Sequence, residues 1–172
     1  MLDFAQWLGQ TWISLAIQTN LWVIPTVQSI HIVAIGIVLS SVFMIDLRVF
    51  GWAGTDQTLA ETTRRFAPWL WGALGVLLAT GMLMIVGEPV RELLSLSFWL
   101  KMTLVCVGVG LAAGFQMALR RHEREWEESL VNRRTTKGLA AATFLVWCGV
   151  VILGRLIAYD YVWGSWSPAP RL

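Results

Sequence analysis

The chain has 172 residues, of which 56% are hydrophobic and only 14% are charged. Soluble domains carry about 25% charged residues, and apolar runs of about 20 residues, as found here, have the length of membrane-spanning helices. These properties exclude an ordinary soluble domain and predict an integral membrane protein with a single membrane domain over residues 1–172. The net charge of +2 is too small to suggest a nucleic-acid partner. Cys106 and Cys148 each stand alone in an apolar run, so neither a disulfide framework nor a zinc site is expected.

The N-terminal segment predicts a helix along the membrane surface. Over residues 3–19, apolar side chains recur at three- and four-residue spacing, beginning with Phe4, Trp7 and Leu8. Polar residues lie elsewhere around the helix, which is typical of an amphipathic interfacial helix. A helix packed on the end of a bundle is an equally good interpretation. The segment has no basic region of the kind that begins a cleavable signal peptide, so we expect it to be retained.

Four apolar segments follow, and each predicts a transmembrane helix. They cover about 22–45, 67–87, 98–119 and 138–159, with Pro68 expected in the first turn of the second. Short connections favour an all-α, up-down-up-down four-helix bundle. Gly110 and Gly114 would allow a close contact of the third helix with a neighbour. Residues 120–137 carry charges of both signs and predict a solvated extension of the third helix.

The basic residues predict the orientation of the bundle in its membrane. Cytoplasmic loops carry an excess of Lys and Arg. The side that holds the loops after the first and third spans has nine such residues: Arg48, Arg64, Arg65, Arg120, Arg121, Arg124, Arg133, Arg134 and Lys137. The opposite side has four: Arg91, Lys101, Arg155 and Arg171. We therefore expect a bacterial inner-membrane protein with both termini in the periplasm.

A histidine lies near the middle of the first span. An ionisable side chain at this depth is costly and indicates a function. In one interpretation, His31 is an axial ligand to a haem iron, Lys101 and Arg155 face the haem propionates, and Met82 or Met84 is a second ligand. In the other, His31 hydrogen-bonds a neighbouring carbonyl or serine, and the two cations extend to the membrane surface.

Three further polar residues have simpler interpretations. Asp46 and Arg48 close the first span and are expected to be anchors at a helix end. A proton path from Asp46 to His31 is conceivable, although few polar residues separate them. His122 follows the third span and is expected to be solvated. It lies too far from His31 in depth to bind the same iron, which excludes a two-haem carrier with four histidine ligands.

These residues carry a family resemblance over about Trp7 to Tyr159. The motifs His31…Gly36…Asp46-Leu47-Arg48-Val49-Phe50-Gly51, Thr80-Gly81 and Phe98-Trp99-Leu100-Lys101 resemble those of a widespread, largely uncharacterised family of bacterial four-span membrane proteins.

The layout is also similar to that of two better-known groups. In HemJ-type protoporphyrinogen oxidases, which bind haem b, a histidine in the first span and a lysine after a Thr-Gly are functional, and His31 and Lys101 match them. The extra histidines and the Asn-Glu-x-Pro-like segment of that group are missing, so the oxidase activity is not implied. The likeness to CopD-type copper-resistance proteins implies copper handling, with His31, Met82, Met84 and Met102 as ligands.

The sequence therefore leaves three functions open. The first is a redox-associated membrane protein that binds haem b. The second is a copper-binding or copper-transport module. The third is an accessory subunit without a cofactor, acting in the lipid bilayer with another membrane protein or as a homo-oligomer. No nucleophile–base pair and no phosphate-binding loop is present to indicate a reaction.

Overall fold

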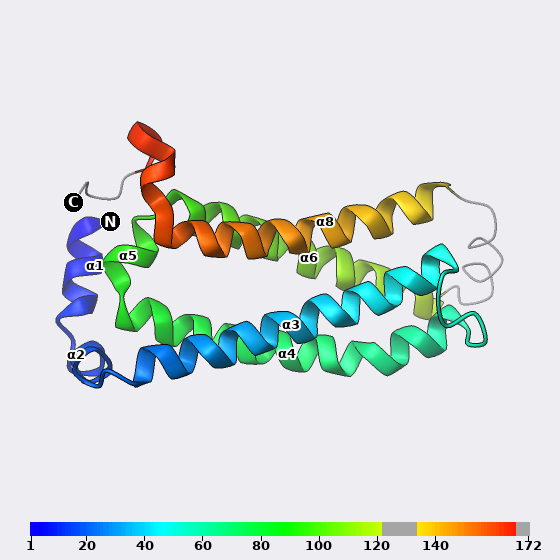
Figure 1. The fold of residues 1–172 in the computed structure, drawn as a ribbon, viewed down its shortest axis with the longest axis horizontal. Helices are drawn as coiled ribbons and strands as arrows, with labels where there is room; N and C mark the ends of the chain where they lie inside the picture. Colours follow the sequence, from blue (N-terminus) through cyan, green and yellow to red (C-terminus); the bar gives the residue numbers. More distant parts are fainter. Residues whose placement is uncertain (122–133, 168–172) are drawn as a thin grey trace.

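Every element that the structure describes is a helix (Figure 1). The structure is a computed structural model, and it describes residues 1–121 and 134–167. Four long, apolar helices confirm the predicted all-α four-helix bundle: α3 (Val23–Phe50), α4 (Leu59–Gly87), α6 (Leu96–Arg121) and α8 (Arg134–Leu156). Each has the length and hydropathy of a membrane-spanning helix, so the chain is a multi-pass membrane protein.

The four long helices are arranged as two pairs. Helix α3 packs along α4, helix α6 packs along α8, and the pairs are joined mainly by contact of α3 with α8. Figure 1 shows the pairs lying apart near the end where the chain begins. We call this the terminal end, and it carries α1 (Leu2–Gly9), α2 (Trp12–Thr19) and α5 (Pro89–Leu93). The opposite end, which carries residues 51–58, is called the loop end.

The segment predicted as one amphipathic helix over residues 3–19 is divided into α1 and α2. Thr11 lies at the break between them. Its hydroxyl donates to the Leu8 carbonyl over 2.7 Å, and its oxygen accepts from the Ser14 amide over 3.4 Å. The same side chain therefore bonds the end of one helix and caps the start of the next, which lets the chain turn.

Helix α2 is held against the end of α4. The buried Ser14 hydroxyl donates to the Val86 carbonyl over 2.6 Å. Gly87 permits this close packing, because a Cβ there would lie 2.6 Å from Ile24 Cδ1 and 3.0 Å from Ile17 Cγ2. The opposite faces of α1 and α2 leave aromatic side chains exposed, with Trp12 at 78%. One face thus packs on the bundle and the other suits a membrane interface.

Local capping sets the lengths of α3 and α4, which extend further than the predicted spans. Helix α3 continues to Phe50 and ends at Gly51, whose φ of 75° is readily adopted by glycine. Helix α4 begins after Thr58, whose hydroxyl oxygen accepts from the Glu61 amide while the Glu61 carboxylate accepts from the Thr58 amide. The expectation that Pro68 begins the helix was wrong, since this capping box starts α4 earlier and places Pro68 inside it.

Removing the Thr58 cap should destabilise the protein modestly. In a Thr58→Ala variant, the first turn of α4 loses a hydrogen bond that water replaces only in part, so we expect the free energy of unfolding to fall by about 1 kcal/mol. Denaturant unfolding in detergent measures this change. Thr55→Ala alters an exposed threonine of the same loop and is the control. Equal losses in the two variants would show that the cap does not stabilise α4.

The apolar core lies in two clusters, and each joins residues from several helices. The middle cluster consists of Ala34, Val38, Val42, Leu70, Ala73, Ala112 and Trp147. The loop-end cluster consists of Ile45, Val49, Leu59, Leu119 and Ala140. Within the part of the bundle that is described, these two clusters fill much of the space between the helices.

Two glycines bring α6 and α8 together. A Cβ at Gly108 would lie 3.1 Å from the Trp147 ring, and a Cβ at Gly149 would lie 3.0 Å from Leu104. Gly110 and Gly114, which the sequence predicted to make a close contact, have no side-chain neighbour at this range. The spacing of the glycines predicted a tight interface but placed it on the wrong face of α6.

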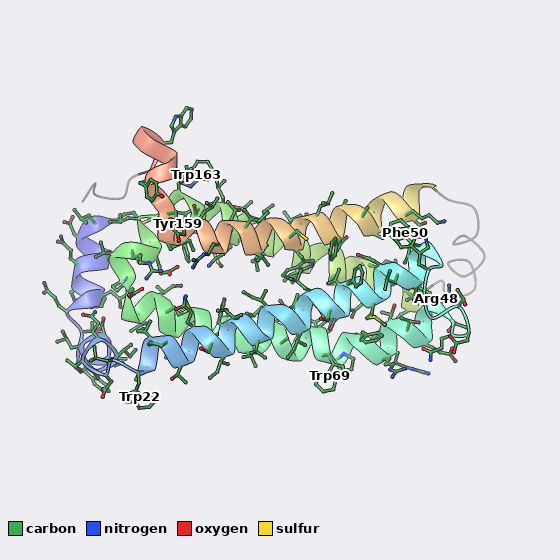
Figure 2. All side chains as sticks on the ribbon, viewed as in Figure 1. Trp22, Arg48, Phe50, Trp69, Tyr159 and Trp163 are labelled. Carbon is green, nitrogen blue, oxygen red and sulfur yellow. The ribbon has the colours of Figure 1, made fainter. Side chains whose placement is uncertain are left out.

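Some aromatic side chains project from the bundle, and another holds the segment after α8 against α6. Figure 2 shows Trp22 and Trp69 pointing away from the helices, in agreement with their exposed fractions of 69% and 64%. After α8, the chain forms a 3₁₀ segment, η1 (Ile157–Trp166), at the terminal end. In it, the Trp163 indole N–H donates to the Ser97 hydroxyl over 2.7 Å, which fixes η1 to the start of α6.

Candidate functional site

The candidate site begins with a hydrogen bond between the two helices of the first pair. His31 of α3 lies half-buried, and its Nδ1 is 2.7 Å from the hydroxyl oxygen of the buried Thr80 in α4. Neither residue belongs to a turn or a helix end, so the bond joins two rigid elements. The sequence left open whether His31 bonds a carbonyl, a serine or a cofactor, and the partner of its Nδ1 is a threonine hydroxyl.

The bonds of Thr80 favour one tautomer of His31. The Thr80 hydroxyl lies 2.7 Å from the Val76 carbonyl, one turn earlier in α4, and can donate its one proton there. Its oxygen then accepts a proton from His31 Nδ1. In this tautomer, Nε2 of the imidazole keeps its lone pair. A hydrogen bond at one ring nitrogen is the usual way in which a protein orients a histidine whose other nitrogen binds a metal.

Glycine at position 81 leaves room beside the imidazole ring. A Cβ at Gly81 would lie 3.7 Å from His31 Cε1, which is van der Waals contact. Larger side chains at this position would extend further over the ring. The Thr80-Gly81 pair of the sequence therefore has two local roles, since Thr80 bonds the ring and Gly81 adds no side chain beside it.

Lys101 of α6 brings positive charge to the same region. Its ammonium interacts electrostatically with His31 and with Glu92 of α5. The Nζ atom lies 5.4 Å from the centre of the Phe98 ring, which is a cation–π contact. The Lys101 side chain also lies beside Gly154 of α8, where a Cβ would be 3.7 Å from Lys101 Cδ. Lys101 is half-buried. It therefore connects the terminal end of the bundle with His31 instead of only extending outward.

Glu92 is a member of this site that the sequence did not indicate. It is 3% exposed and lies in the short helix α5. Burial raises the pKa of its carboxyl, while Lys101 and Arg91 lower it and Glu88 raises it further. We call His31, Thr80, Glu92 and Lys101 the polar cluster.

The raised pKa of Glu92 predicts how stability changes with pH. The folded protein holds this proton to a higher pH than the unfolded chain does. Stability should therefore fall as pH rises from the ordinary pKa of a glutamate through the raised pKa of Glu92. Glu92→Gln should remove this part of the decline, as measured by denaturant unfolding in detergent across the acid-to-neutral range. The control is Asp56→Asn, which alters an exposed acid in the loop at the opposite end of the bundle. An unchanged pH profile in Glu92→Gln would contradict the assignment.

Arg155 lies outside the polar cluster. It is exposed, its guanidinium donates to the Tyr159 hydroxyl over 3.3 Å, and it lies 5.3 Å from the centre of that ring. Figure 2 shows Tyr159 at the terminal end, where α8 gives way to η1. Arg155 therefore contacts Tyr159 at the terminal end, and the convergence of His31, Lys101 and Arg155 around one cavity stays a prediction.

The methionines predicted as ligands differ in their placement. Met82 is 55% exposed and lies two residues from Thr80, on another face of α4. Met102 is 36% exposed. Met84 is half-buried and follows Thr80 by four residues, so it shares the Thr80 face of α4. In the described residues, no three His, Cys, Asp or Glu side chains form a metal-binding group. His122 lies outside the described residues.

The chain was also compared with known proteins. Residues 4–160 match the model of a family described as a family of unknown function, DUF6644. This agrees with the predicted likeness to an uncharacterised family. No curated protein and no solved structure matches the chain. The more distant likeness to HemJ-type and CopD-type proteins therefore stays a prediction.

Proposed function

We propose that this chain, which belongs to the DUF6644 family, is a membrane protein that binds haem b through Nε2 of His31. The observation that carries the proposal is the 2.7 Å bond of His31 Nδ1 to Thr80, together with the bond of Thr80 to the Val76 carbonyl. These contacts favour an oriented, neutral imidazole with a free lone pair inside a membrane bundle. When bound, the haem would supply one-electron redox chemistry.

The polar cluster holds two of the groups that a haem site requires. A haem needs an axial nitrogen, an apolar slot and positive charge near its propionates. His31 supplies the nitrogen and Lys101 supplies the charge, and they come from the two different helix pairs. Gly81 adds no side chain beside the His31 ring. Met84 is the candidate for a second ligand, because it shares the Thr80 face, whereas Met82 is largely exposed.

The same placement favours haem over copper. A copper site built from soft ligands would need several thioethers beside His31. Met82 and Met102 are both exposed, and the faces of their helices direct them toward the surroundings of the bundle. Of these methionines, only Met84 is half-buried and on the same face of α4 as Thr80, as a ligand beside His31 would have to be.

We also propose a location for the haem. With nine basic residues on one side and four on the other, the positive-inside rule predicts a bacterial inner-membrane protein with both termini in the periplasm. The terminal end would then face the periplasm, and the polar cluster would lie in the outer half of the bilayer. Electrons would be exchanged with a partner on the periplasmic side.

An absorption spectrum tests the proposal directly. The protein is produced in haem-replete bacteria, purified in detergent, and measured oxidised and after reduction with dithionite. We expect a Soret band with stoichiometric haem b, and we expect His31→Ala to lose it because no replacement axial nitrogen is available. Met82→Leu, which alters an exposed side chain, should retain it. A protein without a Soret band, or one whose band is unchanged in His31→Ala, would contradict the proposal and favour an accessory subunit.

A further inference from the structure

A second polar feature lies far from the polar cluster, at the loop end of the bundle. It is a cavity of about 50 Å³ whose walls come from α3, α4, α6 and α8. Asp46 of α3 lines it, fifteen residues after His31, which is about 22 Å along a helix. The middle cluster of apolar residues separates the two regions. The cavity is therefore distinct from the proposed haem site.

Asp46 is buried, and one of its two carboxylate oxygens has no hydrogen-bond partner in the described residues. The residue is 7% exposed, and this oxygen is Oδ2. Among the residues that line the cavity, Asp46 is the one titratable side chain. An unpartnered carboxylate in apolar surroundings costs several kcal/mol or more, so a compensating group is required.

The neighbouring charges do not supply this compensation. On α4 and α6, the basic side chains nearest the loop end are exposed: Arg64, Arg65, Arg120 and Arg121. Arg48 of α3 donates to the Gln57 carbonyl over 2.6 Å. Lys137 of α8 is half-buried and does not line the cavity. Asp46 is therefore a residue of the cavity wall whose Oδ2 is bonded to no basic side chain of the described residues.

The cavity is large enough for water and has polar side chains that can bond it. A water molecule needs a cavity volume of about 10–15 Å³. The volume of about 50 Å³ therefore accommodates about three water molecules. The Gln116 carbonyl oxygen accepts from the Trp71 indole over 2.9 Å, which leaves the Gln116 amide protons available as donors. The Thr143 hydroxyl donates to the Leu139 carbonyl over 2.9 Å, which leaves its oxygen as an acceptor. Both side chains line the cavity.

We propose that this cavity is a hydrated site at which Asp46 binds one monovalent cation, either a proton or a sodium ion. A single positive charge neutralises the single carboxylate, and the water molecules bridge it to Gln116 and Thr143. A divalent ion would require more carboxylates than the cavity offers, since no group of three acidic, histidine or cysteine side chains is found in the described residues. The site does not depend on haem binding.

Infrared spectroscopy of the full-length protein in liposomes tests this proposal. At neutral pH, with choline as the only added cation, a bound proton gives a carboxylic-acid band that Asp46→Asn abolishes. If sodium is the ligand, replacing choline chloride by sodium chloride shifts a carboxylate band of Asp46 at constant pH. Asp3→Asn alters an exposed acid and should leave both features in place. An Asp46 that is ionised at neutral pH and insensitive to sodium would overturn the proposal.

Isotope labelling keeps the test valid if Asp46→Asn fails to fold. The chain has four aspartates, Asp3, Asp46, Asp56 and Asp160, and of the three whose side chains are described, Asp46 alone is buried. In the unaltered protein labelled with carbon-13 at the aspartate carboxyl, the acid band or the sodium-sensitive band should move to lower frequency. Bands that do not move would exclude aspartate and overturn the proposal.

Discussion

Replacing Thr80 by valine should weaken haem binding by about 10- to 100-fold, the usual effect of losing a group that orients a metal-bound histidine. Valine has nearly the shape of threonine but cannot accept a proton from His31 Nδ1. The imidazole would then lose the 2.7 Å bond that holds its tautomer and its ring orientation. Haem titration into protein prepared without haem, followed by the Soret band, measures the change.

Two variants separate this effect from a general loss of packing. Thr103→Val removes a hydroxyl that donates to the Trp99 carbonyl one turn earlier, just as the Thr80 hydroxyl donates to the Val76 carbonyl. Unlike Thr80, Thr103 is exposed. It should leave the affinity for haem unchanged. Thr80→Ser keeps the hydroxyl and should retain most of the affinity. If Thr80→Val bound haem as tightly as the unaltered protein, His31 would not depend on this bond.

Replacing Trp147 by alanine should lower the free energy of unfolding by about 3–5 kcal/mol, the largest loss of stability expected for a single substitution here. Trp147 is 3% exposed and lies in the middle cluster, where its ring packs against Gly108 of α6. Its removal would leave a cavity between α6 and α8 that neighbouring side chains cannot fill. Unfolding in detergent by a denaturant, followed by circular dichroism, measures the loss.

Trp69→Ala is the matched control for the core tryptophan. Trp69 is 64% exposed and points away from the bundle (Figure 2), so its surroundings change little when the protein unfolds in detergent. We expect a loss below about 1 kcal/mol. Equal losses for the two tryptophans would mean that the space between α6 and α8 is not packed as described.

The fold was predictable because each span carries its own signal. Length and hydropathy identify a membrane helix without reference to its neighbours. The ends of the helices were less predictable, since a cap depends on a few side chains. Thr11 divides the N-terminal segment into two helices, and Thr58 with Glu61 starts α4 before Pro68. Both signals were present in the sequence as capping residues.

The candidate site was predicted in part. The position of a residue along a helix follows from the sequence, whereas the side of the helix that faces the bundle is harder to assign. His31 and Lys101 were expected at one depth, and the charge of Lys101 acts electrostatically on His31. Met82 and Arg155 were expected with them, yet both side chains are exposed. Glu92 was missed because its burial results from the packing of α5 under the terminal end, which no local pattern reports.

The central claim is that His31 binds a haem iron, and pulsed electron paramagnetic resonance tests it most directly. The chain has two histidines, so a His122→Gln variant leaves His31 as the only one. This variant is labelled with nitrogen-15 histidine, and its oxidised form is compared with the unlabelled form. We predict that the label changes the hyperfine coupling of a nitrogen bound directly to the iron. Identical spectra from haem-loaded labelled and unlabelled protein would contradict the claim.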